Sequence, residues 1–456
     1  MRHALTRFPL KAVADLPELL KTDLSRNHDR CPLPPLHLTG RVTKVAGTSI
    51  EVEGLRSSIG SQCSVFCSRG TSRVDAEVIG FSDTRLFLMP YKSVDGLAPG
   101  CRVQQRPSNS QGRLTEALVG RVLDGFGEPL DGGLLPPYHH FANLDGKLLN
   151  PMQRPPITTI LETGIKAIDT CLTLGRGQRL GLIAGSGVGK SVLLGMLARN
   201  TKADVVVIGL IGERGREVQE FISRTLGRRG LQRSVVIAAP ANASPLERIR
   251  AAKLTHLIAE YFRDRGDDVL MLFDSLTRVA HAQREIGLAV GEPPTTKGYP
   301  PSVFSLLPNL IERPGMGING TGSITSFYTV LAEGDDRNDP IVDIARASLD
   351  GQVMLSRALA DKAHYPAIDL AGSVSRVANN LLDPDRTRLA QRLRRLWSLY
   401  SEKEDLIHIG AYEAKSSAEV DEAIRVQPLL SVFLRQQEEE RFDYEDSWGL
   451  LRGIVR

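Results

Sequence analysis

The chain has 456 residues, of which 41% are hydrophobic and 24% are charged, a balance typical of a globular protein with about three domains. Its 57 basic and 53 acidic side chains leave a formal net charge of +4, an excess too small to indicate nucleic acid or a membrane surface as a partner. Five cysteines, an odd number, predict reduced thiols in a cytosolic protein, and the spacing of Cys63 and Cys67 is weak for zinc.

The first segment, residues 1–30, has apolar residues at broadly helical spacing that Pro9 and Pro17 interrupt. It is equally compatible with a docking helix and with a packed arm. No signal-peptide core is expected there, and the longest strongly apolar run, Val205–Ile211, is far too short to span a bilayer.

Residues 31–108 contain short β-type runs separated by turn signals, which predicts a small β-barrel. The runs begin at Gly40, Ser49, Val74, Arg85 and Gly100.

Residues 109–382 alternate apolar strands with helical stretches, which predicts a parallel sheet with helices on both faces. A helix is expected at 245–265, with Ser244 as its N-cap and Pro245 in its first turn. The expected strands are 204–212, 234–239, 268–274 and 323–331.

Residues 383–456 are predicted to form a helical domain. A cluster of arginines on its first helix is compatible with a basic contact surface, but a solvated face is the favoured interpretation. The cluster comprises Arg388, Arg392, Arg394 and Arg395.

Residues 181–191 read Gly-Leu-Ile-Ala-Gly-Ser-Gly-Val-Gly-Lys-Ser, an apolar strand end followed by a glycine-rich turn, which predicts a nucleoside triphosphate site. Glycines let consecutive N–H groups point at an anion, and the helix that follows adds its positive end. Lys190 would reach the β- and γ-phosphates, and the Ser191 hydroxyl would join the coordination shell of Mg²⁺. Ala184 replaces the first glycine of the strict pattern, which is acceptable at negative φ. The predicted contacts are Gly185, Ser186, Gly187, Val188, Gly189, Lys190, Ser191 and Val192.

Two carboxylates follow apolar strands in the same region. Asp274 is predicted to anchor the metal, with a helix N-cap for the segment from Leu276 as the alternative. Glu213, inside a Gly-Glu-Arg turn, is predicted to orient and polarise the attacking water. Glu217 and Glu220 lie on the next helix and are expected to be exposed.

Longer stretches carry a resemblance to a known family. Residues 366–375, Pro-Ala-Ile-Asp-Leu-Ala-Gly-Ser-Val-Ser, follow the signature of the α and β subunits of rotary ATP synthases. The chain more closely resembles the flagellar type III protein export ATPases, on residues 175–191, 291–304 and 331–340. The resemblance is strong from about residue 120 to 424 and faint before 36.

The resemblance implies an α/β fold: a RecA-like P-loop ATPase core between an N-terminal β-barrel and a helical C-terminal domain, with ATP and Mg²⁺ as ligands and six copies in a ring. An arginine finger across a subunit interface makes hydrolysis depend on assembly. The implied roles are phosphate and Mg²⁺ binding for Lys190 and Ser191, water activation for Glu213, support of that carboxylate for Arg214, packing on adenine for Tyr365, and the finger for Arg376. The alternatives are a salt bridge within one subunit for Arg376 and ordinary packing for Tyr365.

The implied function is ATP hydrolysis that energises flagellar protein export, at the cytoplasmic face of the export gate and peripheral to the inner membrane. The implied partners are a stator-like regulatory protein at the N-terminus, a coiled-coil stalk in the ring pore, membrane proteins of the export gate, and chaperone–substrate complexes. Residues 291–301 are expected to form a loop, the region that faces the pore in related rings.

Other members of the superfamily are alternatives. The injectisome ATPase of virulence-type secretion shares every catalytic residue, although the phosphate loop favours the flagellar branch. A rotary synthase subunit is disfavoured because the C-terminal domain lacks the acidic loop typical of the β subunit. A hexameric RNA translocase would need aromatic and basic side chains on the barrel, where the aromatics are scattered, so no nucleic acid is expected.

Overall fold

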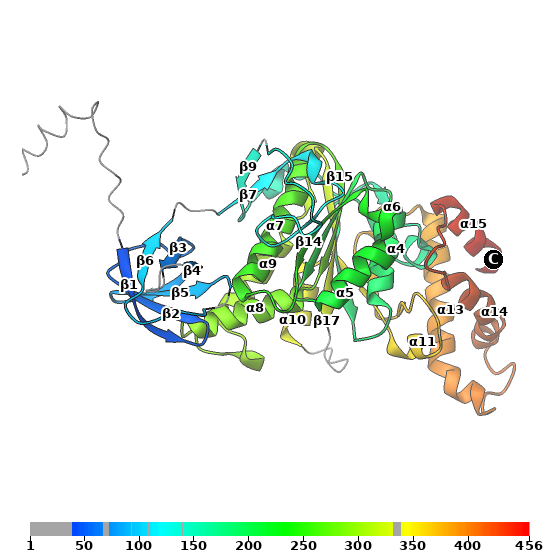
Figure 1. Cartoon of the computed structure of the whole chain (residues 1–456). Helices are drawn as coiled ribbons and strands as arrows, with labels where there is room; N and C mark the ends of the chain where they lie inside the picture. Colours follow the sequence, from blue (N-terminus) through cyan, green and yellow to red (C-terminus); the bar gives the residue numbers. More distant parts are fainter. Residues whose placement is uncertain are drawn as a thin grey trace, which may run out of the picture.

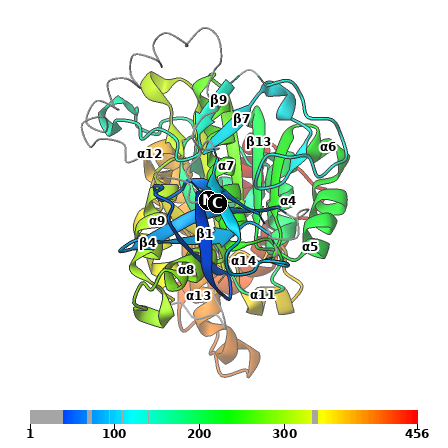
Figure 2. The same ribbon diagram turned by 60° about the vertical axis from the view of Figure 1, so that its left-hand side comes forward.

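The computed structural model describes residues 39–66, 73–92, 94–106, 110–138, 140–331 and 339–455. The interpretations of residues 1–30 and of Cys67 lie outside these residues. A barrel, a sheet-centred domain and a helical domain follow one another along the molecule (Figure 1), and the barrel lies in front of the sheet when the view is turned (Figure 2). Within the described ranges, no helix has the length and apolar character needed to cross a membrane.

The predicted β-barrel is confirmed as a closed barrel with strand order β1-β2-β5-β4-β3-β6. Buried and exposed residues alternate along β4, as expected for a strand with one face in a core. The sequence analysis missed β3, because Cys63, Ser64 and Val65 are all buried and give no alternating signal. The strands are β1 (Thr39–Ala46), β2 (Ser49–Glu53), β3 (Gln62–Phe66), β4 (Arg73–Ser82), β5 (Arg85–Pro90) and β6 (Arg102–Gln105).

The second domain contains a nine-stranded sheet whose five central strands are parallel, as predicted. These strands are buried along nearly their whole length, so they appear in the sequence as continuous apolar runs. In spatial order they are β12 (Arg179–Ala184), β17 (Ser323–Leu331), β15 (Asp268–Asp274), β13 (Val205–Ile211) and β14 (Ser234–Ala239). Short strands complete the sheet: β18 (Gly351–Met354) and β19 (Val374–Ser375) lie at one edge, β8 (Val122–Leu123) lies at the other, and β16 (Gly315–Met316) pairs with β17.

Helices cover both faces of this sheet (Figure 1). On one face lie α7 (Pro245–Asp264), α8 (Leu276–Ala289) and α9 (Pro301–Ile311); α4 (Lys190–Asn200) lies on the other. The predicted start of α7 is confirmed, because the Ser244 hydroxyl accepts a hydrogen bond from the Glu247 amide at 3.2 Å. Residues 291–301 form the expected irregular connection, with a single 3-10 turn at Thr296–Gly298.

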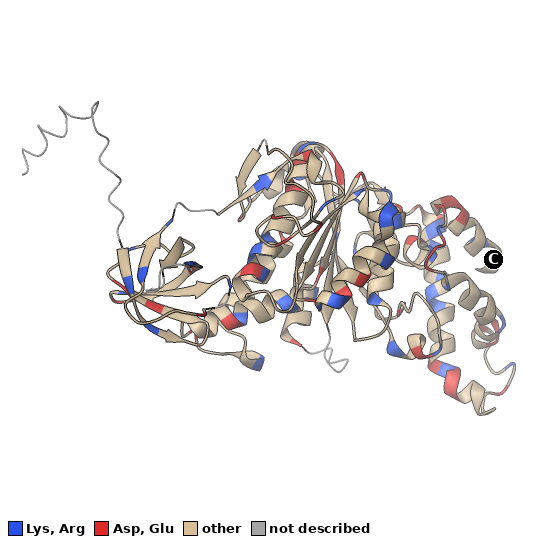
Figure 3. Cartoon of the chain, viewed as in Figure 1, with Lys and Arg blue, Asp and Glu red and all other residues tan. Residues whose placement is uncertain are grey.

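The C-terminal domain consists of α13 (Pro384–His408), α14 (Ala418–Leu434) and α15 (Tyr444–Val455). The interpretation of its arginine cluster as a solvated face is confirmed for Arg388, Arg392 and Arg395, which are exposed, but not for Arg394. Acidic side chains also lie on α13 (Figure 3). Arg392 and Arg395 pair with Glu422 and Glu419 of α14 at 2.6 Å each. Arg394 is part-buried and donates to the Ser373 carbonyl, so it docks the helical domain onto the sheet domain.

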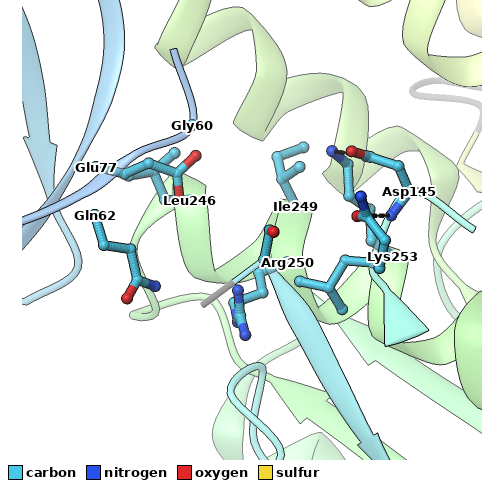
Figure 4. Close-up of a pocket in the computed structure, with 11 residues that line it drawn as sticks. Gly60, Gln62, Glu77, Asp145, Leu246, Ile249, Arg250 and Lys253 are labelled. Carbon is cyan, nitrogen blue, oxygen red and sulfur yellow. Dashed lines mark hydrogen bonds and ion pairs between the residues drawn. The ribbon is translucent and has the colours of Figure 1, made fainter. Parts of the chain in front are cut away.

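The barrel meets the sheet domain across a small cavity beside α7. Figure 4 shows Gln62 and Glu77 of the barrel on one side, and the Lys253–Asp145 ion pair, at 2.6 Å, on the other. Tyr91, just after β5, donates a hydrogen bond to Glu77 at 2.6 Å and packs edge-on against Phe126. Burial raises the pKa of Glu77. The junction therefore combines one aromatic contact with several polar groups.

Deeper in the sheet domain, α7 and the end of α9 are joined by a buried ion pair. Arg313 donates to both carboxylate oxygens of Glu260, at 2.7 and 2.8 Å, and to the Leu144 carbonyl at 2.8 Å. The two charged side chains are only 5% and 7% exposed. A pair held this way is costly to break because the remaining charge stays buried.

Glu260→Ala would leave the Arg313 guanidinium buried without its carboxylate, so we expect the free energy of unfolding to fall by about 3–5 kcal/mol. The matched control is Glu220→Ala, which removes a carboxylate that is 47% exposed and pairs with Arg224; it should cost about 0.5 kcal/mol or less. Urea unfolding followed by circular dichroism compares the two variants. Equal decreases in the free energy of unfolding would contradict the claim that burial makes the Glu260–Arg313 pair costly to break.

Candidate functional site

A cavity of about 660 Å³ lies where the central strands end, the edge at which ligands bind in parallel α/β sheets. Its size is within the usual range for a bound small molecule. Its lining includes seven of the eight predicted phosphate-loop contacts; Val188 is buried instead. The lining residues are Ala184, Gly185, Ser186, Gly187, Gly189, Lys190, Ser191, Val192, Glu213, Arg214, Glu217, Arg278, Leu331 and Arg357.

The turn between β12 and α4 requires glycine. Gly187 and Gly189 have φ values of 78° and 90°, in the left-handed region that other residues avoid. A Cβ atom at Gly189 would also lie 3.3 Å from Cε1 of Tyr365. Ala184 is the last residue of β12 and does not have a positive φ, so its replacement of the first glycine is accommodated as expected.

Lys190 joins the two carboxylates that the sequence analysis singled out. Its Nζ lies 2.6 and 2.8 Å from the two oxygens of Asp274, and 3.6 Å from Oε1 of Glu213. Burial by itself would lower the pKa of Lys190, but the two neighbouring carboxylates outweigh it and the pKa is raised. The first residue of α4 and two carboxylates at the ends of β13 and β15 therefore form one charged cluster.

Asp274 is 5% exposed and also accepts a hydrogen bond from the Thr329 hydroxyl at 2.6 Å. It does not cap the following helix: Ser275 is the N-cap of α8 and accepts from the Arg278 amide at 3.3 Å. The alternative of a helix cap for Asp274 is therefore excluded. Its carboxylate is held between Thr329 and Lys190, and Lys190 in turn lines the cavity.

Glu213 follows β13 and is the titratable group best placed to exchange a proton near neutral pH. Burial, followed by the nearby Asp274 charge, raises the pKa of Glu213 to about 7, although Lys190 acts in the opposite direction. Its Oε1 is buried and has no hydrogen-bond partner. Glu217 and Glu220 are exposed as expected, yet Glu217 also lines the cavity.

Three predicted residues lie apart from this cluster. The Arg214 side chain is 84% exposed and pairs with Glu217 at 3.7 Å, so its predicted support of Glu213 is not formed within a single chain. Tyr365 is 43% exposed and lies against Gly189, outside the cavity lining. Arg376 follows β19, is exposed, and donates to the Arg346 carbonyl at 3.2 Å; it does not reach its own chain's cavity.

The sequence analysis assigned no role to three groups that the fold brings here. Arg357, at the start of α11 (Arg357–Asp361), donates to the Ser186 carbonyl at 2.9 Å. Arg278 lines the cavity from α8, and Thr329 holds Asp274. Arg278 lies four residues after Asp274, and this short spacing could have predicted that it lies near the cavity. Arg357 and Thr329 are too distant in the chain for any pattern to connect them to the loop.

The residues present fit a magnesium ion that arrives with phosphate. Ser191 offers a hydroxyl at the cavity and Asp274 a carboxylate, whereas the described part of the chain contains no group of three His, Cys, Asp or Glu side chains that could hold a metal. Mg²⁺ is commonly bound by one or two protein ligands together with substrate phosphates and water.

Each of the three structural parts matches a known family. Residues 42–106 match the beta-barrel domain, and residues 164–375 the nucleotide-binding domain, of the ATP synthase alpha/beta family. Residues 382–453 match the T3SS EscN ATPase C-terminal domain.

Similar proteins cover nearly the whole chain. A flagellum-specific ATP synthase of Pseudomonas aeruginosa is 51% identical over 426 residues, 93% of this chain and 94% of the relative. One from Salmonella typhimurium is 52% identical over 424 residues, covering 91% and 93%. A type 3 secretion system ATPase of Xanthomonas euvesicatoria is 46% identical over 437 residues, covering 96% and 98%.

The fold is similar to solved secretion ATPases. The assembled ATPase EscN from the enteropathogenic E. coli type III secretion system has a TM-score of 0.86 and 40% identity, covering 91% of this chain and 100% of that chain. EscN in complex with its central stalk EscO gives 0.83 and 39%, with the same coverage. With a P-loop cavity, three matching domains and relatives at about half identity, the chain belongs to the flagellum-specific ATP synthase family.

Proposed function

We propose that this chain hydrolyses ATP to energise protein export by the flagellar type III apparatus. The observation that carries the proposal is the meeting of Lys190, Glu213 and Asp274 beside a glycine-rich loop, with Lys190 and Glu213 lining one cavity. A loop of backbone amides and a lysine suits a triphosphate, and a carboxylate with a pKa near 7 suits the acceptance of a proton from water.

In this proposal the triphosphate takes Lys190 away from Asp274, because the phosphates offer the ammonium group a larger negative charge. Asp274 and Ser191 are then available to Mg²⁺, which would neutralise charge on the phosphate oxygens. Glu213 orients the attacking water and accepts its proton. Arg278 and Arg357 add positive charge to the walls of the cavity.

A complete site requires a second subunit in this proposal. Arg376 is exposed on the β19 side of the sheet and outside its own cavity, which suits a finger that acts on a neighbour. The Arg214 and Tyr365 side chains are also exposed, so a neighbouring subunit or a bound nucleotide can contact them. We propose a homo-hexameric ring, in keeping with the assembled EscN structure, with a coiled-coil stalk in its pore as the EscN–EscO complex suggests.

Cytoplasmic location at the inner membrane of the flagellar base, and contacts with the export gate, chaperone–substrate complexes and an N-terminal stator-like protein, belong to the same proposal. Their support is family membership. The flagellar branch is favoured over the injectisome because the flagellum-specific relatives are 51% and 52% identical, against 46% for the Xanthomonas secretion ATPase.

Expression of the chain in a Salmonella typhimurium strain that lacks its flagellum-specific ATP synthase should restore swimming motility and the secretion of flagellar proteins. The Glu213→Gln variant should fail to do so. The parallel experiment uses a Xanthomonas euvesicatoria strain that lacks its type 3 secretion system ATPase, where we expect no restored secretion. Rescue in Xanthomonas alone would assign the chain to the injectisome branch.

Glu213→Gln keeps the shape of the side chain but removes the charge that polarises water, so ATP should bind with little change while kcat falls by about 10² or more. The raised pKa adds a pH test: a carboxyl with a pKa of about 7 is mostly protonated below that pH. The kcat/KM of the unmodified chain should therefore fall about tenfold per pH unit below 7, and the variant should lack this limb. Normal turnover by the variant would transfer the role to another carboxylate.

Arg376→Ala leaves each subunit's own loop intact, so ATP affinity should change little while turnover falls by about 10³ or more. Lys190→Ala should be inactive for a different reason, because it lacks the lysine that binds phosphate. Mixing the two variants creates interfaces where an intact loop meets an intact Arg376, so measured ATPase activity should partly return. If ATPase activity does not return in verified mixed rings, Arg376 acts on the cavity of its own subunit.

A further inference from the structure

Behind Tyr365, three segments that are far apart in the sequence meet at Gln436, whose backbone N–H contacts Tyr365 and whose side chain contacts the other two. They are residues 163–166 at the start of α3 (Lys166–Cys171), Tyr365 itself, and residues 435–443 between α14 and α15. Gln436 is only 4% exposed. It belongs to the helical domain, yet its partners include groups of the sheet domain.

Every hydrogen-bonding group of the Gln436 side chain has a partner. Its Oε1 accepts from the Lys166 amide at 2.9 Å, and its Nε2 donates to the Gly164 carbonyl at 2.8 Å and to the Glu440 carbonyl at 3.0 Å. Its backbone N–H donates to the Tyr365 carbonyl at 2.9 Å. A fully satisfied buried amide fixes one arrangement, because any displacement leaves polar groups unpaired.

The segment that receives Gln436 is itself held firmly. The Asp169 carboxylate accepts from the Thr163 amide and hydroxyl at 2.9 and 2.7 Å, and from the Gly164 amide at 3.0 Å. The Lys166 ammonium lies 4.2 Å from the centre of the Phe442 ring, which follows Gln436 in the same connection. The Asp169 hydrogen bonds thus hold the segment that receives Gln436, and the Lys166–Phe442 contact holds the connection that carries Gln436.

Tyr365 is the end of this chain of contacts. Its carbonyl is held by Gln436 on one side, and its ring lies against Gly189 of the phosphate loop on the other. The preceding residue, His364, accepts from Arg435 at 3.4 Å, so two consecutive residues of the helical domain contact two consecutive residues here. The helical domain thus sets the position of the backbone that carries Tyr365.

We infer that Gln436 is a positioning residue of the nucleotide site, which holds Tyr365 where its ring can pack on the nucleotide base. The inference rests on the proposed function, in which Tyr365 takes that role. Gln436 does not touch the phosphates or the attacking water, so it acts on base binding and leaves the chemical step alone. It also makes nucleotide affinity depend on how the helical domain is docked, and linkage requires the reverse dependence as well.

Gln436→Met keeps the length of the side chain and removes its three hydrogen bonds. We expect the KM for ATP to rise about tenfold while kcat stays within about twofold, the pattern of lost ground-state binding. Inhibition by inorganic tripolyphosphate, which has no base, should be unchanged. The matched control is Gln437→Met, the same change at the exposed neighbouring position, which should leave both constants unaltered. A fall in kcat with unchanged KM, or an equal effect in the control, would overturn the inference.

Tyr365→Ala separates failure of this inference from failure of the proposed base contact. It should raise the KM for ATP by a similar factor, and the double variant with Gln436→Met should show little further loss, because both changes remove one contact. If Tyr365→Ala leaves KM unchanged, Tyr365 does not contact the nucleotide base, and the positioning role of Gln436 is then wrong as well. If Tyr365→Ala raises KM and Gln436→Met does not, only the positioning role is wrong.

Hydrogen exchange on the unmodified chain provides a test that does not depend on whether a variant folds. A non-hydrolysable ATP analogue should slow exchange of the amides at 434–440 at least threefold, because a held Tyr365 keeps the Gln436 N–H paired. Tripolyphosphate should not produce this slowing. Equal exchange with the analogue and with tripolyphosphate would contradict the inference.

Discussion

The ion pair between Lys190 and Asp274 is the interaction on which the site depends. It joins the helix after β12 to the end of β15, and it places Glu213 within 3.6 Å of the same ammonium group. Burial and the neighbouring Asp274 charge together outweigh the effect of Lys190 and raise the pKa of Glu213 to about 7. The cluster therefore holds one ammonium group between two carboxylates, and a bound polyphosphate would compete with them for that ammonium group.

The parallel sheet holds the two carboxylates of this cluster in place, because they lie at the ends of its paired strands. Parallel strands bring their carboxyl ends to one edge, and buried contacts such as Arg313–Glu260 stabilise the helices behind them. The barrel and the helical domain then attach to opposite ends of the sheet domain (Figure 1). The helical domain shares an apolar core with the sheet domain, and Arg394 and Gln436 add hydrogen bonds to the Ser373 and Gly164 carbonyls.

One chain contains the cavity beside the glycine-rich loop and, after β19, an exposed Arg376 that lies outside that cavity. A heterologous contact repeated between copies closes a ring when the rotation permits. Placing a positive charge across such a contact makes turnover a property of the assembly. The proposed ring rests on the similarity of the chain to assembled EscN.

The sequence by itself determined most of the elements and which residues meet at the site: the barrel, the parallel strands, the start of α7, and the glycine loop with Lys190, Glu213 and Asp274. These are encoded in local periodicity and strand-end motifs. It did not reveal β3, whose consecutive buried residues give no alternation. Only the tertiary structure decided that Arg214 turns away from Glu213, and that Thr329, Arg357 and Gln436 lie beside the site. Those contacts join residues up to 272 positions apart, and no local pattern records which distant side chains a sheet and its docked helices bring together.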